Sequence, residues 1–169
     1  MSNKTIRMKI KSTRFDMPEL LFSQVCADIA EDMPELKITD EMLAVAEGEA
    51  LEVNTSGVLT AEDGRIEFSY DESELTGMQG SKTAISYAED NPALVTMMRS
   101  GSVSTSLVFE QGKRHHCVYK TPYMPFEVCV HTLKVDNKLD TDKTLYIDYI
   151  IEIRGAKAER TKLQMTYFE

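Results

Sequence analysis

The sequence contains no tryptophan, only three cysteines and no uninterrupted apolar run approaching the ~18–20 residues needed to cross a bilayer. Residues 1–9 alternate charged with apolar side chains, so we expect neither a secretory signal nor a membrane anchor there. The cysteines, Cys26, Cys117 and Cys129, are odd in number and their spacing forms no disulfide framework. These absences predict a protein of the reducing cytoplasm with no membrane span.

The chain also lacks any excess of positive charge. Its net charge is −9, and residues 15–50 account for all of it, because they contain ten acidic residues and a single base, Lys37. Affinity for a phosphate backbone depends on lysine and arginine. We therefore predict that the protein binds no nucleic acid.

No catalytic signature is present in the sequence. Residues 77–80, Gly-Met-Gln-Gly, are not followed by the lysine and helix of a phosphate-binding loop. His116 could be combined with Ser104 or Ser106 as a base and a nucleophile, but no glycine-flanked nucleophile elbow accompanies them. The sequence predicts no cofactor and argues against an enzyme.

What the sequence does contain is one short β-strand after another from about residue 50 onward. The alternation of apolar and polar residues is clearest where Leu145, Ile147 and Tyr149 share a face. A strand series of this length has to close on itself or expose its edges. We predict a single all-β domain over residues 1–169, a closed antiparallel up-and-down barrel of about 8–10 strands.

A different pattern follows the first strand, which is the alternating segment around residues 6–10. Residues 16–19 and 32–35 share the sequence Asp-Met-Pro-Glu. An aspartate N-cap, a proline in the first turn and a glutamate three residues after the cap are typical of helix starts. Gly48 then supplies a stop. The sequence predicts a short acidic helical insertion over residues 16–48.

Several short segments of the strand region carry a family likeness: residues 70–77, 98–103, 109–112 and 121–123, and Thr132. In their order and spacing they make the chain resemble the YwiB-like domain-of-unknown-function family of bacteria. That family is placed among the calycin-like β-barrels, alongside lipocalins and fatty-acid-binding proteins. The resemblance implies a barrel fold but little chemistry, because the activity of the family is unknown.

Arg99 ends an apolar strand, where its charged head must reach water or a partner. Pointing into a barrel, it could hold a ligand carboxylate or phosphate through a bidentate fork. The alternative is a structural arginine that pairs with Glu72 or Glu74 at the end of the barrel. For the first alternative, the predicted ligand-binding residues are Arg99, Tyr70, Glu72, Tyr119, Thr121 and Tyr149.

Two histidines and two cysteines lie at matching distances on either side of Tyr123. If the flanking strands pair symmetrically about that residue, Cys117 lies opposite Cys129 and His115 lies opposite His131. Zinc prefers such ligands. A shift of one residue would separate them, however, and a flat sheet face converges poorly on a tetrahedral ion. We favour the alternative, in which these are ordinary surface residues and no metal site exists.

Two functions remain open for such a barrel. In the first, the interior binds a small apolar or acidic ligand, with Arg99 and a tyrosine as polar anchors and the helical insertion as a lid. In the second, the core is solid, and the acidic helical segment or the barrel rim binds a basic protein partner without catalysis. Strand count does not separate them, because an eight-stranded barrel can be just filled by its own side chains.

Overall fold

A computed structural model describes residues 2–16, 48–72, 80–101, 104–120, 125–153 and 158–169. The described residues form ten strands and no helix, and therefore no helix that could span a membrane. The strands are β1 (Ser2–Asp16), β2 (Gly48–Glu62), β3 (Arg65–Asp71), β4 (Lys82–Ala88), β5 (Asn91–Ser100), β6 (Ser104–Glu110), β7 (Arg114–Lys120), β8 (Pro125–Lys138), β9 (Thr144–Ile153) and β10 (Ala158–Phe168). The predicted helical insertion falls almost wholly on residues 17–47, which lie outside the described residues.

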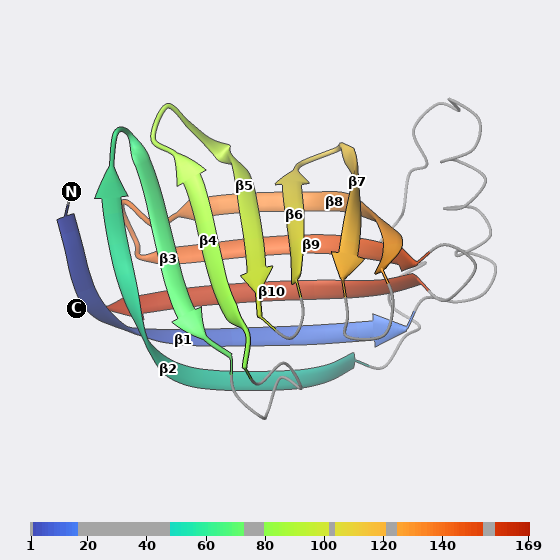
Figure 1. The fold of residues 1–169 in the computed structure, drawn as a ribbon, viewed down its shortest axis with the longest axis horizontal. Helices are drawn as coiled ribbons and strands as arrows, with labels where there is room; N and C mark the ends of the chain where they lie inside the picture. Colours follow the sequence, from blue (N-terminus) through green and yellow to red (C-terminus); the bar gives the residue numbers. More distant parts are fainter. Residues whose placement is uncertain (1, 17–47, 73–79, 102–103, 121–124, 154–157) are drawn as a thin grey trace.

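The ten strands form one closed antiparallel barrel in which each strand pairs with its neighbours in the sequence. β1 completes the ring by pairing with both β2 and β10. In Figure 1, the shorter strands β3 to β7 cross in front of the long strands β8, β9 and β10. The prediction of a closed up-and-down barrel is confirmed.

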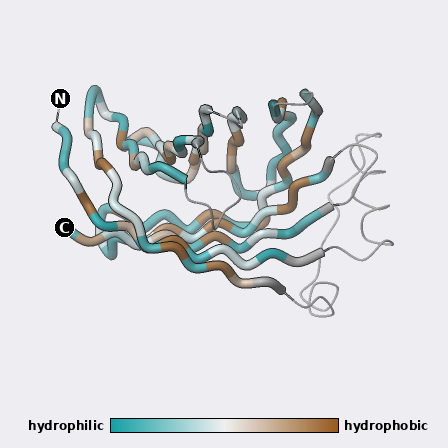
Figure 2. The backbone as a smooth tube through the Cα atoms, turned by 60° about the horizontal axis from the view of Figure 1, so that its bottom comes forward, coloured by the Kyte–Doolittle hydropathy of each residue, from teal (hydrophilic) through white to brown (hydrophobic). Residues whose placement is uncertain are grey.

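The alternation of side chains determines which residues fill the barrel. Figure 2 shows teal and brown bands along the tube, and apolar and polar positions alternate most regularly in β1 and β10. Successive side chains of a strand point to opposite faces, so one set points inward. In β1 the inward set begins with Ile6, Met8 and Ile10, all of which are buried. Inward side chains from nine of the ten strands merge into a single cluster of buried apolar residues, and partly buried Leu59 of β2 packs against it. Most of the interior is therefore packed.

The two ends of the barrel differ in their connections. Tight turns join β2 to β3, β4 to β5, β6 to β7 and β8 to β9, and we call this the turn end. In the first of these turns, Asp63 and Gly64 have φ values of 50° and 75°, the positive range that a two-residue hairpin requires. β1, β3, β5, β7 and β9 finish at the other end, which we call the opposite end.

Gly57 allows three strands to approach one another closely. A Cβ atom at this position would lie 2.5 Å from Sδ of Met8 and 2.7 Å from the carbonyl oxygen of Ser69. Gly57 pairs with Ile6 of β1 and with Tyr70 of β3. The absence of a side chain at Gly57 thus leaves room for the Met8 side chain and for the backbone of β3 at Ser69.

Candidate functional site

Arg99 lies inside the barrel near the opposite end. It follows Val95 and Met97 on the inward face of β5, and both of those residues are fully buried. The Arg99 side chain is only 13% exposed. An enclosed guanidinium requires compensating polar groups, because burial of an unpaired charge is strongly unfavourable.

Glu72 supplies the nearest negative charge. One oxygen of its carboxylate, Oε1, lies 3.7 Å from Nε of Arg99, and the Glu72 side chain is 2% exposed. The same oxygen accepts a hydrogen bond from the hydroxyl of Thr83 at 2.5 Å, and the Glu72 N–H donates to the Ser81 carbonyl at 2.9 Å. Among the described residues, Nε of Arg99 has no hydrogen-bond partner. Glu72 is therefore held by Ser81 and Thr83, and its ion pair with Arg99 is loose.

The register of the sheet places Arg99 in a row of polar inward-facing residues. Across β3, β4, β5, β6 and β7, Tyr70 pairs with Thr83, Thr83 with Arg99, Arg99 with Thr105, and Thr105 with Tyr119. Residues directly opposite one another in adjacent strands point to the same face. One wall of the barrel thus presents two phenols, two threonines and a guanidinium at a single level.

Tyr149 faces this row from β9. It pairs with Thr161 of β10, which in turn pairs with Arg14 of β1. The Tyr149 ring packs on Phe109 with centroids 4.7 Å apart. Burial raises the pKa of Tyr149, whereas the positive charge of Arg99, a hydrogen bond with Thr161 and the charge of Arg14 each oppose that change. Because burial is the largest of these effects, Tyr149 stays protonated at neutral pH.

The electrostatics keep Arg99 charged. Burial alone would lower its pKa, but Tyr149, Tyr119, Tyr70 and Glu72 together place it above the ordinary value. Burial also raises the pKa of Tyr70, and the neighbouring Glu72 carboxylate raises it further. Arg99 therefore stays a guanidinium at neutral pH, and the phenols of Tyr70 and Tyr149 stay protonated and can donate hydrogen bonds.

A cavity of about 50 Å³ opens beside Arg99. It is lined by apolar side chains of the core and by polar side chains, among them Tyr70 and Arg99 of the row described above and Arg14 and Tyr149 from β1 and β9. The lining residues are Ile10, Ser12, Arg14, Leu51, Val53, Tyr70, Glu72, Met97, Arg99, Tyr149 and Leu163. The polar groups are therefore adjacent to space that a small molecule or a few waters can occupy.

The structure brings together most of the residues that the sequence suggested. Arg99, Tyr70, Glu72, Tyr119 and Tyr149, which we call the Arg99 cluster, meet near the opposite end. Thr121 and Glu74, two other residues considered from the sequence, lie outside the described residues. The Arg99–Glu72 ion pair foreseen as the structural alternative is also present.

Sequence reasoning missed the polar residues contributed by neighbouring strands. Thr83, Thr105 and Thr161 are buried beside the cluster, and Arg14 lines its cavity. A signal for Arg14 was present, because it keeps the even-numbered phase of Ile6, Met8 and Ile10, which face inward. Each threonine carries the same signal, because it keeps the phase of a buried apolar residue two positions along its strand. Only the strand register, however, decides which threonines adjoin Arg99.

The proposed symmetry of the β7–β8 hairpin is wrong by one residue. Cys117 pairs with Val128, and His116 pairs with Cys129. The core determines this register, because Val128 and Val130 must both point inward to be buried. Cys117 then joins them inside the barrel, while Cys129 points to the outer face. The two cysteines therefore lie on opposite faces of the sheet.

The one-residue shift also separates the two histidines. His115 pairs with Val130, and His131 pairs with Arg114. Nε2 of His115 lies 3.3 Å from Oε1 of Glu110. Within the described part of the chain, no three His, Cys, Asp or Glu side chains are arranged to hold a metal ion. The alternative interpretation also needs correction, because Cys117 and Cys129 are buried rather than ordinary surface residues.

We expect Cys117 and Cys129 of the native protein to react with iodoacetamide at pH 8 at least about tenfold more slowly than in urea. Burial raises the pKa of both thiols, and burial together with the charge of Glu152 brings that of Cys129 to about 11. Little of either thiol is then ionised at pH 8. Mass spectrometry of peptides from native and urea-treated samples measures the two rates. Rapid native alkylation of Cys117 would contradict its place inside the barrel.

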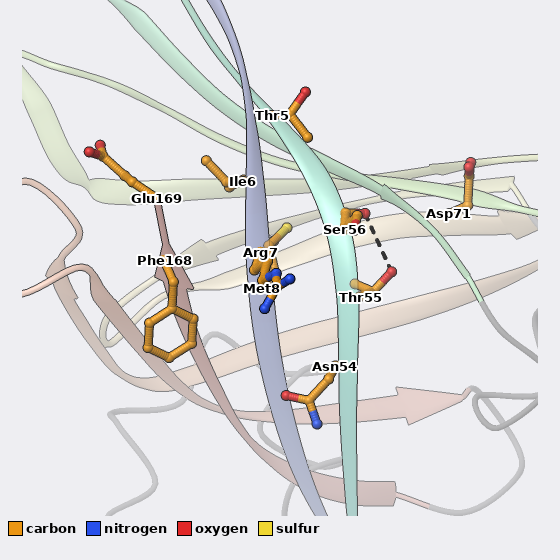
Figure 3. A pocket seen from close by; sticks show the side chains of 10 residues that line it. All are labelled: Thr5, Ile6, Arg7, Met8, Asn54, Thr55, Ser56, Asp71, Phe168 and Glu169. Atoms are coloured by element: carbon orange, nitrogen blue, oxygen red, sulfur yellow. Dashed lines mark hydrogen bonds between the residues drawn. The ribbon is translucent and has the colours of Figure 1, made fainter.

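A separate hollow of about 1210 Å³ lies where β1 passes β2. Figure 3 shows that its side chains do not converge, since Phe168 and Glu169 lie on one side of β1 and Asn54 lies on the other. Its charged residues, Arg7, Asp71 and Glu169, are all exposed. This hollow lacks an enclosed charge of the kind that Arg99 supplies, and we assign no site to it.

Comparison with known proteins identifies the family. The family model described as "Domain of unknown function (DUF1934)" matches residues 36–165. The chain belongs to the DUF1934 family. The matched span contains the whole Arg99 cluster but not Arg14, so Arg14 lies outside the part of this DUF1934 protein that the family model describes.

A solved structure shares the fold. The crystal structure of the ywiB protein from Bacillus subtilis matches with a TM-score of 0.63, covering 99% of this chain and 94% of that chain at 17% identity. At this identity the likeness shows the fold alone. No curated protein matches the chain. The resemblance to the YwiB-like domain-of-unknown-function family and its barrel fold is thus confirmed.

Proposed function

We propose that this DUF1934 barrel binds a small acidic molecule at the Arg99 cluster, with Arg99 as the anchor. The observation that carries the proposal is an enclosed guanidinium whose Nε makes no hydrogen bond with the described residues and whose carboxylate partner lies 3.7 Å away. A carboxylate or phosphate offers the bidentate acceptor that such a guanidinium prefers. The phenols of Tyr70, Tyr119 and Tyr149 are further donors around the same point.

The size of the cavity narrows the ligand class. About 50 Å³ is well below the roughly 300–1,000 Å³ of sites for drug-sized ligands, whereas a single water needs only about 10–15 Å³. A lipid chain does not fit in that volume. Between the apolar and acidic ligands expected from the sequence, the structure favours a small anion. The proposed site lies inside the barrel, as in calycin-like and lipocalin-like barrels, but the proposed ligand is smaller than a lipid.

A second candidate function is a non-enzymatic interaction module. The observation in its favour is the single cluster of buried side chains that fills most of the barrel. The barrel rim or the acidic residues 16–48 would then bind a basic partner. In either case we propose a cytoplasmic protein that binds no nucleic acid and uses no cofactor, because composition and charge favour this assignment.

Titration calorimetry with sodium acetate and with inorganic phosphate tests the anion site. We expect measurable binding to the unmodified protein and an affinity about 10–100-fold lower in Arg99→Met, because the charged hydrogen bonds are lost. Arg7→Met is the matched control, since Arg7 is exposed on the outer face of β1 and its loss should change nothing.

Arg99→Met also leaves the buried Glu72 carboxylate without its ion-pair partner, so thermal unfolding should be measured in parallel. The double variant Arg99→Met/Glu72→Gln removes that leftover charge and should bind neither anion while folding normally. The anion site is refuted if the unmodified protein binds neither acetate nor phosphate. It is also refuted if Arg99→Met binds both anions with the same affinity as the unmodified protein. The interaction module then becomes the better account.

A further inference from the structure

A second arginine lines the same cavity as Arg99. Arg14 keeps the inward phase of β1, and it borders the cavity together with Ser12, Tyr149 and Arg99. Arg99 is nearly enclosed, whereas the Arg14 side chain is half exposed. The cavity therefore has one deep cation and one cation at its rim.

The register explains how the two cations are related. Arg14, Thr161 and Tyr149 form one row across β1, β10 and β9, and adjacent strands are about 4.8 Å apart. Arg99 belongs to the row on the other wall. Tyr149 and both arginines line the same small cavity. A ligand in that cavity that contacts Tyr149 is thus close to two positive charges.

The partner of Arg14 is replaceable. Nε of Arg14 lies 3.7 Å from Oε1 of Glu159, and both side chains are about half exposed. Ion pairs between exposed side chains contribute little, because water and salt screen them. An anionic group of a ligand can therefore take the place of Glu159 at low cost. The deep pair of Arg99 with Glu72 has no such exposure.

We propose that the site accepts a small molecule with two anionic groups, of the short dicarboxylate class. The inner carboxylate binds Arg99 and the phenols, and the outer carboxylate binds Arg14 in place of Glu159. This inference rests on the proposed anion site and adds the number and arrangement of the ligand's charges. A monocarboxylate should therefore depend on Arg99 alone, whereas a dicarboxylate should depend on both Arg99 and Arg14.

Calorimetry with acetate, malonate and succinate tests the inference. We expect the unmodified protein to bind one of the dicarboxylates at least about tenfold more tightly than acetate, since a second charged hydrogen-bonded pair is formed. Arg14→Gln should remove that difference while leaving the affinity for acetate within about twofold. Arg7→Gln, on the outer face of the same strand and well separated from Arg14, should change neither affinity.

The variant Glu159→Gln provides a second, independent test. Removal of the competing carboxylate should strengthen dicarboxylate binding severalfold and leave acetate binding unchanged. If Arg14→Gln weakens both ligand types equally, or neither, and Glu159→Gln does not raise dicarboxylate affinity, the two-charge ligand is refuted. That result leaves the proposed function standing as long as Arg99→Met still lowers the affinity for acetate about 10–100-fold. A protein that binds none of the three anions refutes both.

Discussion

Replacement of Asp148 by alanine should lower the free energy of unfolding by about 3–5 kcal/mol. Oδ1 of Asp148 accepts from Nε of Arg160 at 2.8 Å, and Oδ2 accepts from Nη2 at 2.5 Å. Both side chains are only 9% exposed, and Ile150, which pairs with Arg160, is fully buried. Without the carboxylate, the guanidinium of Arg160 remains enclosed with its bidentate partner removed.

Urea denaturation monitored by circular dichroism measures this loss, with the slope of the transition checked for constancy. The matched control is Glu52→Ala, which removes the partner of Lys9 at 3.4 Å on the exposed surface of the same barrel. That change should stay within about 0.5 kcal/mol, because exposed pairs contribute little. The double variant Asp148→Leu/Arg160→Met should recover most of the stability. Equal effects of Asp148→Ala and Glu52→Ala would contradict our account of the buried pair.

Phe109→Ala should be comparably disruptive, with an expected loss of about 3–5 kcal/mol. The Phe109 side chain is fully buried in the core cluster and packs on Tyr149 with ring centroids 4.7 Å apart. Its removal leaves a cavity and takes away one wall of the pocket in which the Tyr149 ring lies. We therefore expect a second consequence, a weaker affinity for acetate at the Arg99 cluster.

The control for this variant is Phe168→Ala. Phe168 is an aromatic residue of the same barrel but is 51% exposed, so its loss should change stability by no more than about 0.5–1 kcal/mol. Urea denaturation compares the two, and calorimetry on folded samples compares their acetate affinities. If Phe109→Ala destabilises the protein but leaves acetate binding unchanged, the support of Tyr149 by Phe109 is not needed for the site.

Different parts of the barrel account for its stability and for its candidate binding site. The inward apolar cluster and the Asp148–Arg160 pair account for stability, whereas the polar rows at the opposite end leave a small cavity with an enclosed charge. Because the apolar side chains already pack most of the interior, polar residues such as Thr83 and Thr105 near its end are not needed to fill it. Their accumulation around Arg99 is what makes the site a candidate for binding.

Much of the fold was predictable from local patterns. Alternation identified the strands, and the Asp63-Gly64 turn was recognisable because its positive φ values favour those residue types. The prediction of closure followed from the exposed edges that an open sheet of this length would have. The β7–β8 register was mispredicted because the residues around Tyr123 contain two prolines and have no standard turn signal.

The sequence by itself determined the faces of the strands. Arg99 shares its phase with Val95 and Met97, and Tyr149 shares its phase with Leu145 and Ile147, so both were identifiable as inward residues. That information is local, because successive side chains of a strand point to opposite sides whatever the strand pairs with.

Only the tertiary structure decided which inward residues meet. Arg14 reaches the site because β1 pairs with β10, and Arg99 lies level with Tyr119 because three strands are in register. Registers between strands depend on how the whole core packs and on the length of each connection, and no local pattern encodes either. The Cys117 pairing illustrates this, since a shift of one residue moved it from a supposed metal patch into the core.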